Sequence, residues 1–263
     1  MKTVSIASGS KGNCTFIGFR NANILVDIGI PCFLLEERLG QLNIDPKSID
    51  AILITHEHCD HCSGVDVFAR KYKTKVFMHA NGYPYIRQKL NKLPDSQIIC
   101  INGSTVFIND VMVSAVPLHH NSGFCVSYSV SDGKSKVSIA TDTGHLTEEI
   151  LEHLSGSDIL FLEANHDERR LLMNPNYSPY LKRLILSPQG HLSNTECGTA
   201  LAKLVKTGVR QVILSHLSEE NNTPEIAYTT VKNILQKHGI IEGENVFVDV
   251  AYQHKVGTVF EME

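Results

Sequence analysis

The sequence has no long hydrophobic run. No stretch approaches the roughly 20 apolar residues that a membrane-spanning helix needs, and the amino end, MKTVSIASGSKGNC, lacks the apolar core of a signal peptide. The seven cysteines are an odd number and have none of the spacing of a disulfide framework. Reduced thiols fit this pattern, so the sequence predicts a cytoplasmic protein.

An excess of positive charge is also lacking. The formal charge of −4 argues against binding nucleic acid by bulk positive potential, although two bound divalent cations would offset it locally. The composition, with 42% hydrophobic and 20% charged residues, is ordinary for a folded chain, and 263 residues fit a single domain over 1–263. The 13 histidines stand out, since imidazoles suit metal binding and proton transfer near neutral pH.

Short β-rich runs alternate with helical patterns along almost the whole chain. Ser193 and Glu196 form a capping-box pattern, and Thr223-Pro224 opens a helix that Gly239 closes. The strands are too many for one small open sheet, so we predict an α+β fold, a four-layer αββα sandwich. Strands are expected at 3–7, 23–27, 51–55, 75–79, 105–117, 124–130, 136–141, 158–164, 211–215, 245–250 and 255–262, and helices at 34–43, 63–72, 83–92, 147–154, 179–186, 194–206 and 224–238.

The segment THEHCDHCSG, residues 55–64, concentrates metal-binding side chains. His56 and His58 follow the apolar run AILIT, and Asp60 and His61 come next, before a helix expected near Ser63. A strand end is rigid and can hold two imidazoles on one face, while the following turn directs the next two side chains elsewhere. One loop can therefore supply half of each of two metal sites.

Two other interpretations of this loop involve its cysteines. His56, His58, Cys59 and Cys62 could form a structural zinc knuckle, but such sites usually draw ligand pairs from two separated elements. Cys59 and Cys62 could also form a redox pair, which leaves the intervening acid unexplained. We therefore expect both cysteines to have no part in the chemistry.

Further candidate ligands follow other apolar runs. His119 and His120 follow VSAVPL, Asp142 follows VSIAT, and His216 follows QVILS. Each one alone could be a solvated loop residue. Together with the loop at 56–61 they indicate a site for two metals, built at strand ends.

The motifs resemble those of the metallo-β-lactamase superfamily. HEHCDH is similar to its HxHxDH motif, and ILVDIG, HH, TDTG and SHLS resemble the remaining motifs in the same order. SGSKGN near the amino end, LEANHD at 162–167, GHLSN at 190–194 and HLSEENN at 216–222 resemble the WalJ/YycJ-like branch over nearly the whole chain.

The resemblance implies a specific set of metal ligands. His120 aligns with the family histidine in preference to His119, although Asn121 stands where the family usually has an acid. Asp142 would bridge the two ions. Metal one would be held by His56, His58 and His120, and metal two by Asp60, His61 and His216.

Further roles are implied for three carboxylates and one histidine. Asp60 is predicted to be catalytic as well as a ligand. Asp27, at the end of ILVD, resembles an aspartate that supports the site from behind, and alternatively caps the turn before Gly29. Glu163 and His191 match a pair that transfers a proton to the leaving group in the related tRNase Z enzymes, while a loop histidine that caps nearby backbone is the other interpretation of His191.

The predicted activity is hydrolysis by a hydroxide that bridges two divalent ions. Zn²⁺ suits imidazole and carboxylate ligands best, and Mn²⁺ or Fe²⁺ is possible. Flavodiiron relatives that reduce oxygen have an acid in place of His58, so redox chemistry is disfavoured. Two non-nuclease alternatives are a lactone or thioester hydrolase and a zinc protein without catalytic activity.

The resemblance favours DNA as the substrate and an exonuclease as the enzyme. Basic residues that could hold its backbone, or could equally form ordinary solvated surface, are Arg169, Arg170, Lys182 and Arg183, with Lys71, Lys73 and Lys75.

Overall fold

Two seven-stranded β-sheets lie at the centre of the computed structural model, which describes residues 1–262. The first sheet has the order β14-β1-β2-β3-β4-β5-β6, and the second has the order β13-β12-β11-β10-β9-β8-β7. The first comprises β1 (Lys2–Ala7), β2 (Cys14–Gly18), β3 (Asn23–Val26), β4 (Ala51–Ile54), β5 (Lys75–His79), β6 (Ile98–Ile101) and β14 (Phe260–Glu261). The second comprises β7 (Thr105–Ile108), β8 (Val111–Leu118), β9 (Cys125–Ser131), β10 (Lys136–Ala140), β11 (Ile159–Glu163), β12 (Gln211–Ser215) and β13 (Phe247–Val250).

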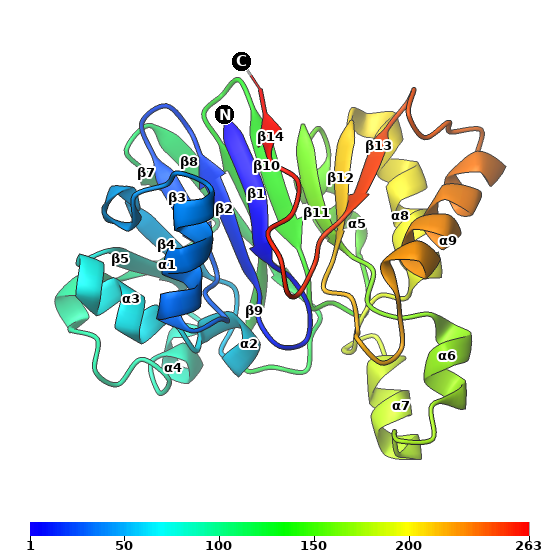
Figure 1. Cartoon of the computed structure of the whole chain (residues 1–263), viewed down its shortest axis with the longest axis horizontal. Coiled ribbons are helices and arrows are strands. Elements are labelled where there is room, and N and C mark those ends of the chain that lie inside the picture. Colours follow the sequence, from blue (N-terminus) through cyan, green and yellow to red (C-terminus); the bar gives the residue numbers. More distant parts are fainter. Residues whose placement is uncertain (263) are drawn as a thin grey trace.

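Helices cover the outer face of each sheet. In Figure 1, α1 and α3 lie on one side of the strands and α8 and α9 on the other. The predicted αββα sandwich is therefore confirmed. The helices are α1 (Cys32–Gln41), α2 (Cys59–Cys62), α3 (Val65–Tyr72), α4 (Tyr83–Ile86), α5 (Glu148–Leu154), α6 (Glu168–Met173), α7 (Pro179–Ile185), α8 (Asn194–Leu204) and α9 (Pro224–Lys237).

Alternation along the strands divides the apolar side chains among three cores. In β4, Ala51 and Leu53 face the second sheet, while Ile52 and Ile54 face the outer helices. The same division occurs on β11, where Phe161 lies between the sheets and Leu160 and Leu162 lie beneath α8. Both faces of these strands are buried, which explains why the sequence shows continuous apolar runs there.

Most predicted elements are confirmed, and the corrections have local causes. The expected strand at 105–117 is a hairpin of β7 and β8, because Asn109 adopts φ 54° and turns the chain. The helix expected at 83–92 ends at Ile86, and the strand at 255–262 pairs only over 260–261. Two strands and two α-helices were not predicted: β2, β6, α2 and α6. The capping box of Ser193 with Glu196 and the helix of 224–237 are confirmed.

Parallel strands carry the sequence motifs to one edge of the sandwich. β3 and β4 run parallel in the first sheet, and β10, β11 and β12 run parallel in the second. Three residues just beyond these strand ends have left-handed backbone: Asp27 (φ 59°), Asp142 (φ 62°) and His216 (φ 56°). Such a conformation is unfavourable for residues other than glycine, and it concentrates at functional sites.

No helix in residues 1–262 is long and apolar enough to span a bilayer.

Candidate metal centre

The seven predicted ligands lie together at this edge. Their side-chain nitrogen and oxygen atoms fall into overlapping groups, and within each group the atoms lie within 4.8 Å of one another. One group is His56, His58 and His120, and another is Asp60, His61 and His216, which are the two predicted half-sites. Asp142 joins His56 and His61 in a third group, between the other two.

The loop after β4 differs in one respect from the prediction. An additional helical turn, α2, spans Cys59–Cys62, so Asp60 and His61 project from a helix, and the helix expected near Ser63 follows as α3 from Val65. Cys59 is exposed, Cys62 lies with its Sγ 3.3 Å from the Glu57 carbonyl oxygen, and neither joins a ligand group within residues 1–262. His119 is exposed, as is Asn121, whereas His120 points into the site.

Each imidazole at the first half-site has one nitrogen available to the interior. The Nδ1 of His120 lies 3.2 Å from the Gly190 carbonyl oxygen, and its Nε2 lies 3.3 Å from the Nδ1 of His58. The Nδ1 of His56 lies 3.0 Å from the Thr55 hydroxyl. The contacts behind the His56 and His120 rings fix their orientation, as such contacts do for metal-binding histidines generally.

The second half-site is arranged in the same way. The Nδ1 of His61 contacts Asp27, and its Nε2 lies 3.0 Å from Oδ2 of Asp142 and 3.4 Å from Oδ2 of Asp60. The Nε2 of His216 lies 3.5 Å from both Asp60 Oδ2 and Asp142 Oδ1. The inner nitrogens of both rings therefore face the same two carboxylates.

Asp27 supports both half-sites. Its Oδ2 accepts hydrogen bonds from His61 Nδ1 at 2.7 Å and from the Thr55 hydroxyl at 2.8 Å, and Oδ1 accepts from the Thr55 N–H at 2.9 Å. The Thr55 hydroxyl in turn contacts His56. Asp27 does not simply cap a turn, because its buried carboxylate reaches one histidine directly and another through Thr55.

Replacing Asp27 by asparagine is expected to lower metal affinity by about 10- to 100-fold, because the contacts behind His61 and His56 lose a charged acceptor. Asparagine tolerates the left-handed backbone at this position. Equilibrium dialysis with metal analysis measures the change. The exposed Asp110→Asn variant is the matched control, and equal affinity in the two variants would contradict the supporting role.

Glu163 connects His216 with His191. Its Oε1 accepts from His191 Nδ1 at 2.7 Å and from His216 Nδ1 at 3.0 Å, and Oε2 accepts from the N–H groups of Thr143 and Leu192. Burial raises the pKa of Glu163, but His191 and His216 outweigh it and lower that pKa to about 2. Glu163 is therefore an ionised acceptor that engages the Nδ1 of His191, whose side chain is partly exposed.

The charge and hydrogen bonding of the cluster fit metal ions. The Nε2 of His56 is buried without a hydrogen-bond partner in residues 1–262. Buried polar groups in proteins are nearly always satisfied, so this nitrogen fits a metal ligand. Several imidazoles and two carboxylates directed at one small space form a donor set for divalent transition metals.

Proton competition predicts how metal uptake depends on pH. Burial lowers the pKa of His216, but Asp142, Asp60 and Glu163 outweigh it and raise that pKa to about 10, and the pKa of His61 is also raised, by Asp142 and Asp27. Each ring must lose its inner proton to bind a metal. We expect proton release on metal uptake at pH 7, with apparent affinity rising about tenfold per pH unit for each proton released.

The stability of the metal-free protein should depend on pH in the opposite direction, falling as pH rises. The raised pKa of His216 stabilises the fold fully below its ordinary value of 6.5, and this contribution is lost as pH rises toward 10. The protons released on metal uptake are counted by titrating the metal into the protein in a calorimeter, in buffers of different ionisation enthalpy. Uptake without proton release would contradict the expected protonation.

Asn13 is a residue of the site that the sequence did not reveal. Its amide nitrogen lies 3.0 Å from His61 Nε2 and 3.4 Å from Asp60 Oδ2, while its Oδ1 accepts the Gly9 N–H. SGSKGN was noted only as part of the resemblance, and the glycines in it are what could have indicated a tight loop. Gly12 has φ 156°, and a Cβ there would lie 2.5 Å from the Gly29 carbonyl oxygen.

The model of the β-lactamase superfamily domain matches residues 22–217. The chain belongs to the metallo-β-lactamase superfamily. Within the superfamily it is 34% identical to "Exodeoxyribonuclease WalJ" of Streptococcus pneumoniae over 88% of this chain and 86% of that protein. It is 30% identical to "Exodeoxyribonuclease YycJ" of Bacillus anthracis over 91% of this chain and 90% of that protein.

The solved structures agree with the fold. The metallo-β-lactamase fold protein YhfI of Bacillus subtilis superposes with a TM-score of 0.73 at 16% identity, over 99% of each chain. This superfamily member therefore lies in the WalJ/YycJ-like branch, as its motifs indicated, and it is a metal-dependent hydrolase.

Proposed function

We propose that this enzyme is a DNA exonuclease that hydrolyses phosphodiester bonds at a centre of two divalent ions. The observation that carries the proposal is the placement of two ligand groups on either side of Asp142, next to the pair of Glu163 and His191. Two relatives of nearly full length bear the name exodeoxyribonuclease. Zn²⁺ is the proposed metal, with Mn²⁺ and Fe²⁺ as alternatives.

The residues have separate roles in this proposal. His56, His58 and His120 would hold one ion, Asp60, His61 and His216 the other, and Asp142 both. When bound, such ions activate water as the nucleophile and neutralise charge on the phosphate. Asp60 would also orient the attack, which is why it is proposed as catalytic.

His191 would act at the leaving group. Glu163 fixes its ring through Nδ1, so that Nε2 is available to donate a proton to the departing oxygen. The His191 side chain is 21% exposed, so a substrate can reach it. General acids positioned in this way contribute about 10²- to 10⁴-fold to a rate.

Digestion of end-labelled linear DNA tests the proposal. Protein loaded with Mn²⁺ or Zn²⁺ should shorten the DNA stepwise from one end, and an Asp142 variant should not. Intact DNA with both metals bound would refute the nuclease function, and a panel of lactones and thioesters would then test the alternative hydrolase.

A further inference from the structure

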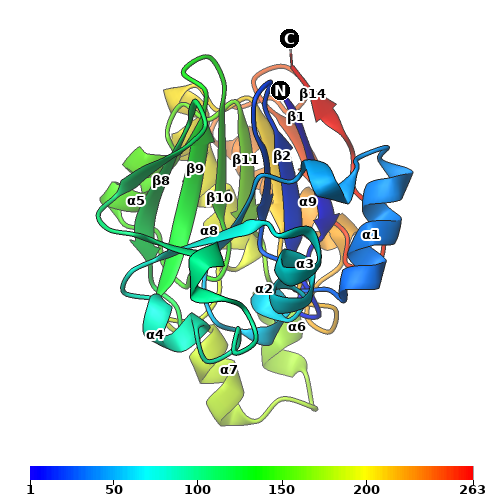
Figure 2. The same cartoon turned by 90° about the vertical axis from the view of Figure 1, so that its left-hand side faces the viewer.

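The hairpin formed by α6 and α7, residues 168–185, projects from the sandwich beside the metal centre. Figures 1 and 2 both show it extending beyond the sheets, at the end of the molecule opposite the two termini. The helices of this hairpin contribute little to the core: Leu171 is the only buried residue of α6, and α7 has none. Short helices gain most of their stability from packing, so a molecule bound to the outer surface of α7 would stabilise this helix.

The hairpin is anchored to the site at both of its ends. Before α6, the Asp167 N–H donates to the Asn221 carbonyl, and the Ala164 N–H donates to Ser215, next to His216. After α7, the His191 N–H donates to the Ile185 carbonyl at 3.0 Å. The Gly190 carbonyl contacts His120, so the two ends of the hairpin lead directly to groups of the metal centre.

Positive charge is concentrated on this hairpin. Residues 168–185 contain four cationic side chains and one acid, Glu168, whereas the whole chain has 24 lysines and arginines against 28 acids. The remainder therefore carries 20 cations against 27 acids, an excess of seven negative charges. None of the four cations forms an ion pair with another group of residues 1–262, and they are Arg169, Arg170, Lys182 and Arg183.

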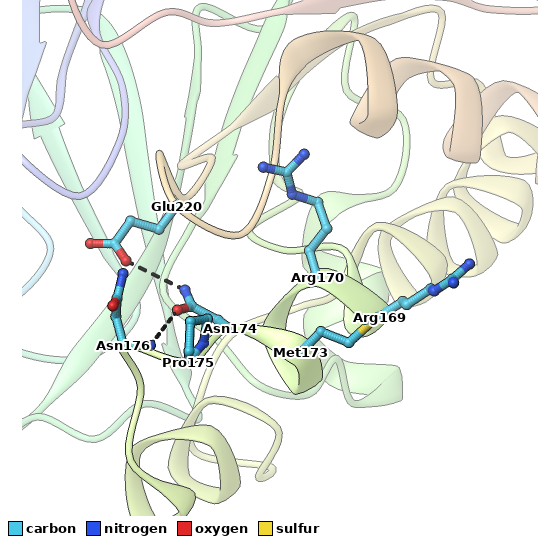
Figure 3. A pocket seen from close by; sticks show the side chains of 7 residues that line it. All are labelled: Arg169, Arg170, Met173, Asn174, Pro175, Asn176 and Glu220. Carbon is cyan, nitrogen blue, oxygen red and sulfur yellow. Dashed lines mark hydrogen bonds between the residues drawn. The ribbon is translucent and has the colours of Figure 1, made fainter.

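A cavity of about 500 Å³ lies against α6, and its lining combines apolar surface from Met173 and Pro175 with polar side chains. Arg169, Arg170, Asn174 and Asn176 contribute polar side chains to its lining. Figure 3 shows the Arg170 guanidinium and the Glu220 carboxylate on different sides of this space. Glu220 is the acid among the lining residues, and its Oε2 accepts a bond from the Asn174 amide at 3.4 Å.

Aromatic and apolar surface lies next to these cations. The Tyr180 side chain is 70% exposed, and Arg183 follows three residues later, on the same face of α7. Leu172 and Met173 on α6 are 59% and 70% exposed. Cations interleaved with an exposed aromatic ring are the features that hold single-stranded nucleic acid, because cations follow the backbone and rings stack on bases.

We propose that the α6–α7 hairpin is an arm that holds a single strand of DNA and leads its end to the metal centre. The inference rests on the proposed nuclease function and adds to it the form of the substrate and the surface that binds it. The arginines hold phosphates and Tyr180 stacks on a base. The excess of acids elsewhere on the chain disfavours a path for the strand over the rest of the surface.

The first test removes charge from the arm. The variant R169A/R170A/R183A is compared with R20A/K47A/K206A, which removes three exposed cations in connections at the strand starts, away from the site. Binding of a phosphorothioate 20-mer to the metal-loaded enzyme is followed by fluorescence anisotropy across salt concentrations. The arm variant should bind about tenfold or more weakly, with a salt slope reduced by about 2, while the control matches the wild type.

Hydrolysis of the small diester bis(p-nitrophenyl) phosphate distinguishes an effect on the arm from an effect on the metal centre. The arm variant should retain kcat on this small diester and lose kcat/KM only on DNA. Normal DNA binding and digestion by the arm variant would refute DNA binding by the hairpin, and the proposed nuclease function would be unaffected. A wild type that neither binds nor digests DNA would overturn the proposed function itself.

Tyr180 tests the single-strand preference. Tyr180→Leu should weaken single-strand binding about fivefold or more, and Tyr180→Phe, which retains the ring, should not. Duplex binding as tight as single-strand binding, with no effect of Tyr180→Leu, would overturn the stacking role. If the wild type proves to be a dimer and the arm variant is a monomer that binds DNA normally, this face is instead an interface between two copies of the chain.

Discussion

Replacing Asp142 by asparagine is expected to abolish hydrolysis, with kcat at least about 10³-fold lower, because metal ions supply several kcal/mol of charge stabilisation. Asp142 lies next to both half-sites: its carboxylate oxygens lie 3.0 Å from the Nε2 of His61, 3.6 Å from that of His120 and 3.5 Å from that of His216. Asparagine retains the size of the side chain and tolerates the left-handed backbone, so the loss should reflect the carboxylate alone.

The measurements are kcat on labelled DNA and on bis(p-nitrophenyl) phosphate, together with metal content. The Asp142→Asn variant should bind fewer ions than the wild type, with a circular dichroism spectrum unchanged, and Asp110→Asn serves as the control of equal chemistry. Activity above a tenth of the wild type would show that Asp142 is not the shared ligand.

Replacing His191 by alanine is expected to have the second largest effect, and the effect should depend on the leaving group. On DNA, whose leaving oxygen is strongly basic, kcat should fall by about 10²- to 10⁴-fold. On bis(p-nitrophenyl) phosphate, whose leaving group departs without a proton, the fall should stay below about tenfold. Metal content should be unchanged, because Glu163 still contacts His216.

The exposed His145→Ala variant is the control for His191→Ala. An equal loss on both substrates would show that His191 positions the site or holds a metal instead of protonating the leaving group. Loss of one ion in the His191 variant would identify it as a ligand, a possibility that its neighbours allow, since Asp142, Glu163, His191 and His216 form a ligand group.

The sequence predicted that the proposed ligands lie together, because two simple regularities locate them. Apolar runs such as AILIT and QVILS are strands buried on both faces, and the polar residues that follow them lie at one edge of parallel strands. The motif at 56–61, through its resemblance to the family motif, indicated which of these residues belong to which half-site. The αββα fold was also predicted from these apolar runs, because the strands that they indicate are too many for one small sheet.

Other features depend on contacts between distant residues that no local pattern records. The amide of Asn13 reaches His61 across 48 positions of sequence, and Glu163 links His191 to His216 because β11 and β12 are neighbours. The strand at 14–18 was missed because CTFIG has glycine and threonine among its few residues. Helix α6 was missed because a six-residue helix with one buried side chain shows little periodicity.

The cluster of metal-binding residues draws its members from both sheets. His56 and His61 follow β4 of the first sheet, while Asp142 and His216 follow β10 and β12 of the second. An ion bound as proposed would thus cross-link the two halves of the sandwich, and its binding energy would add to the free energy of unfolding. In a cell short of metal, the empty protein would open more often and be degraded sooner, so metal supply would set the abundance of the enzyme as well as its activity.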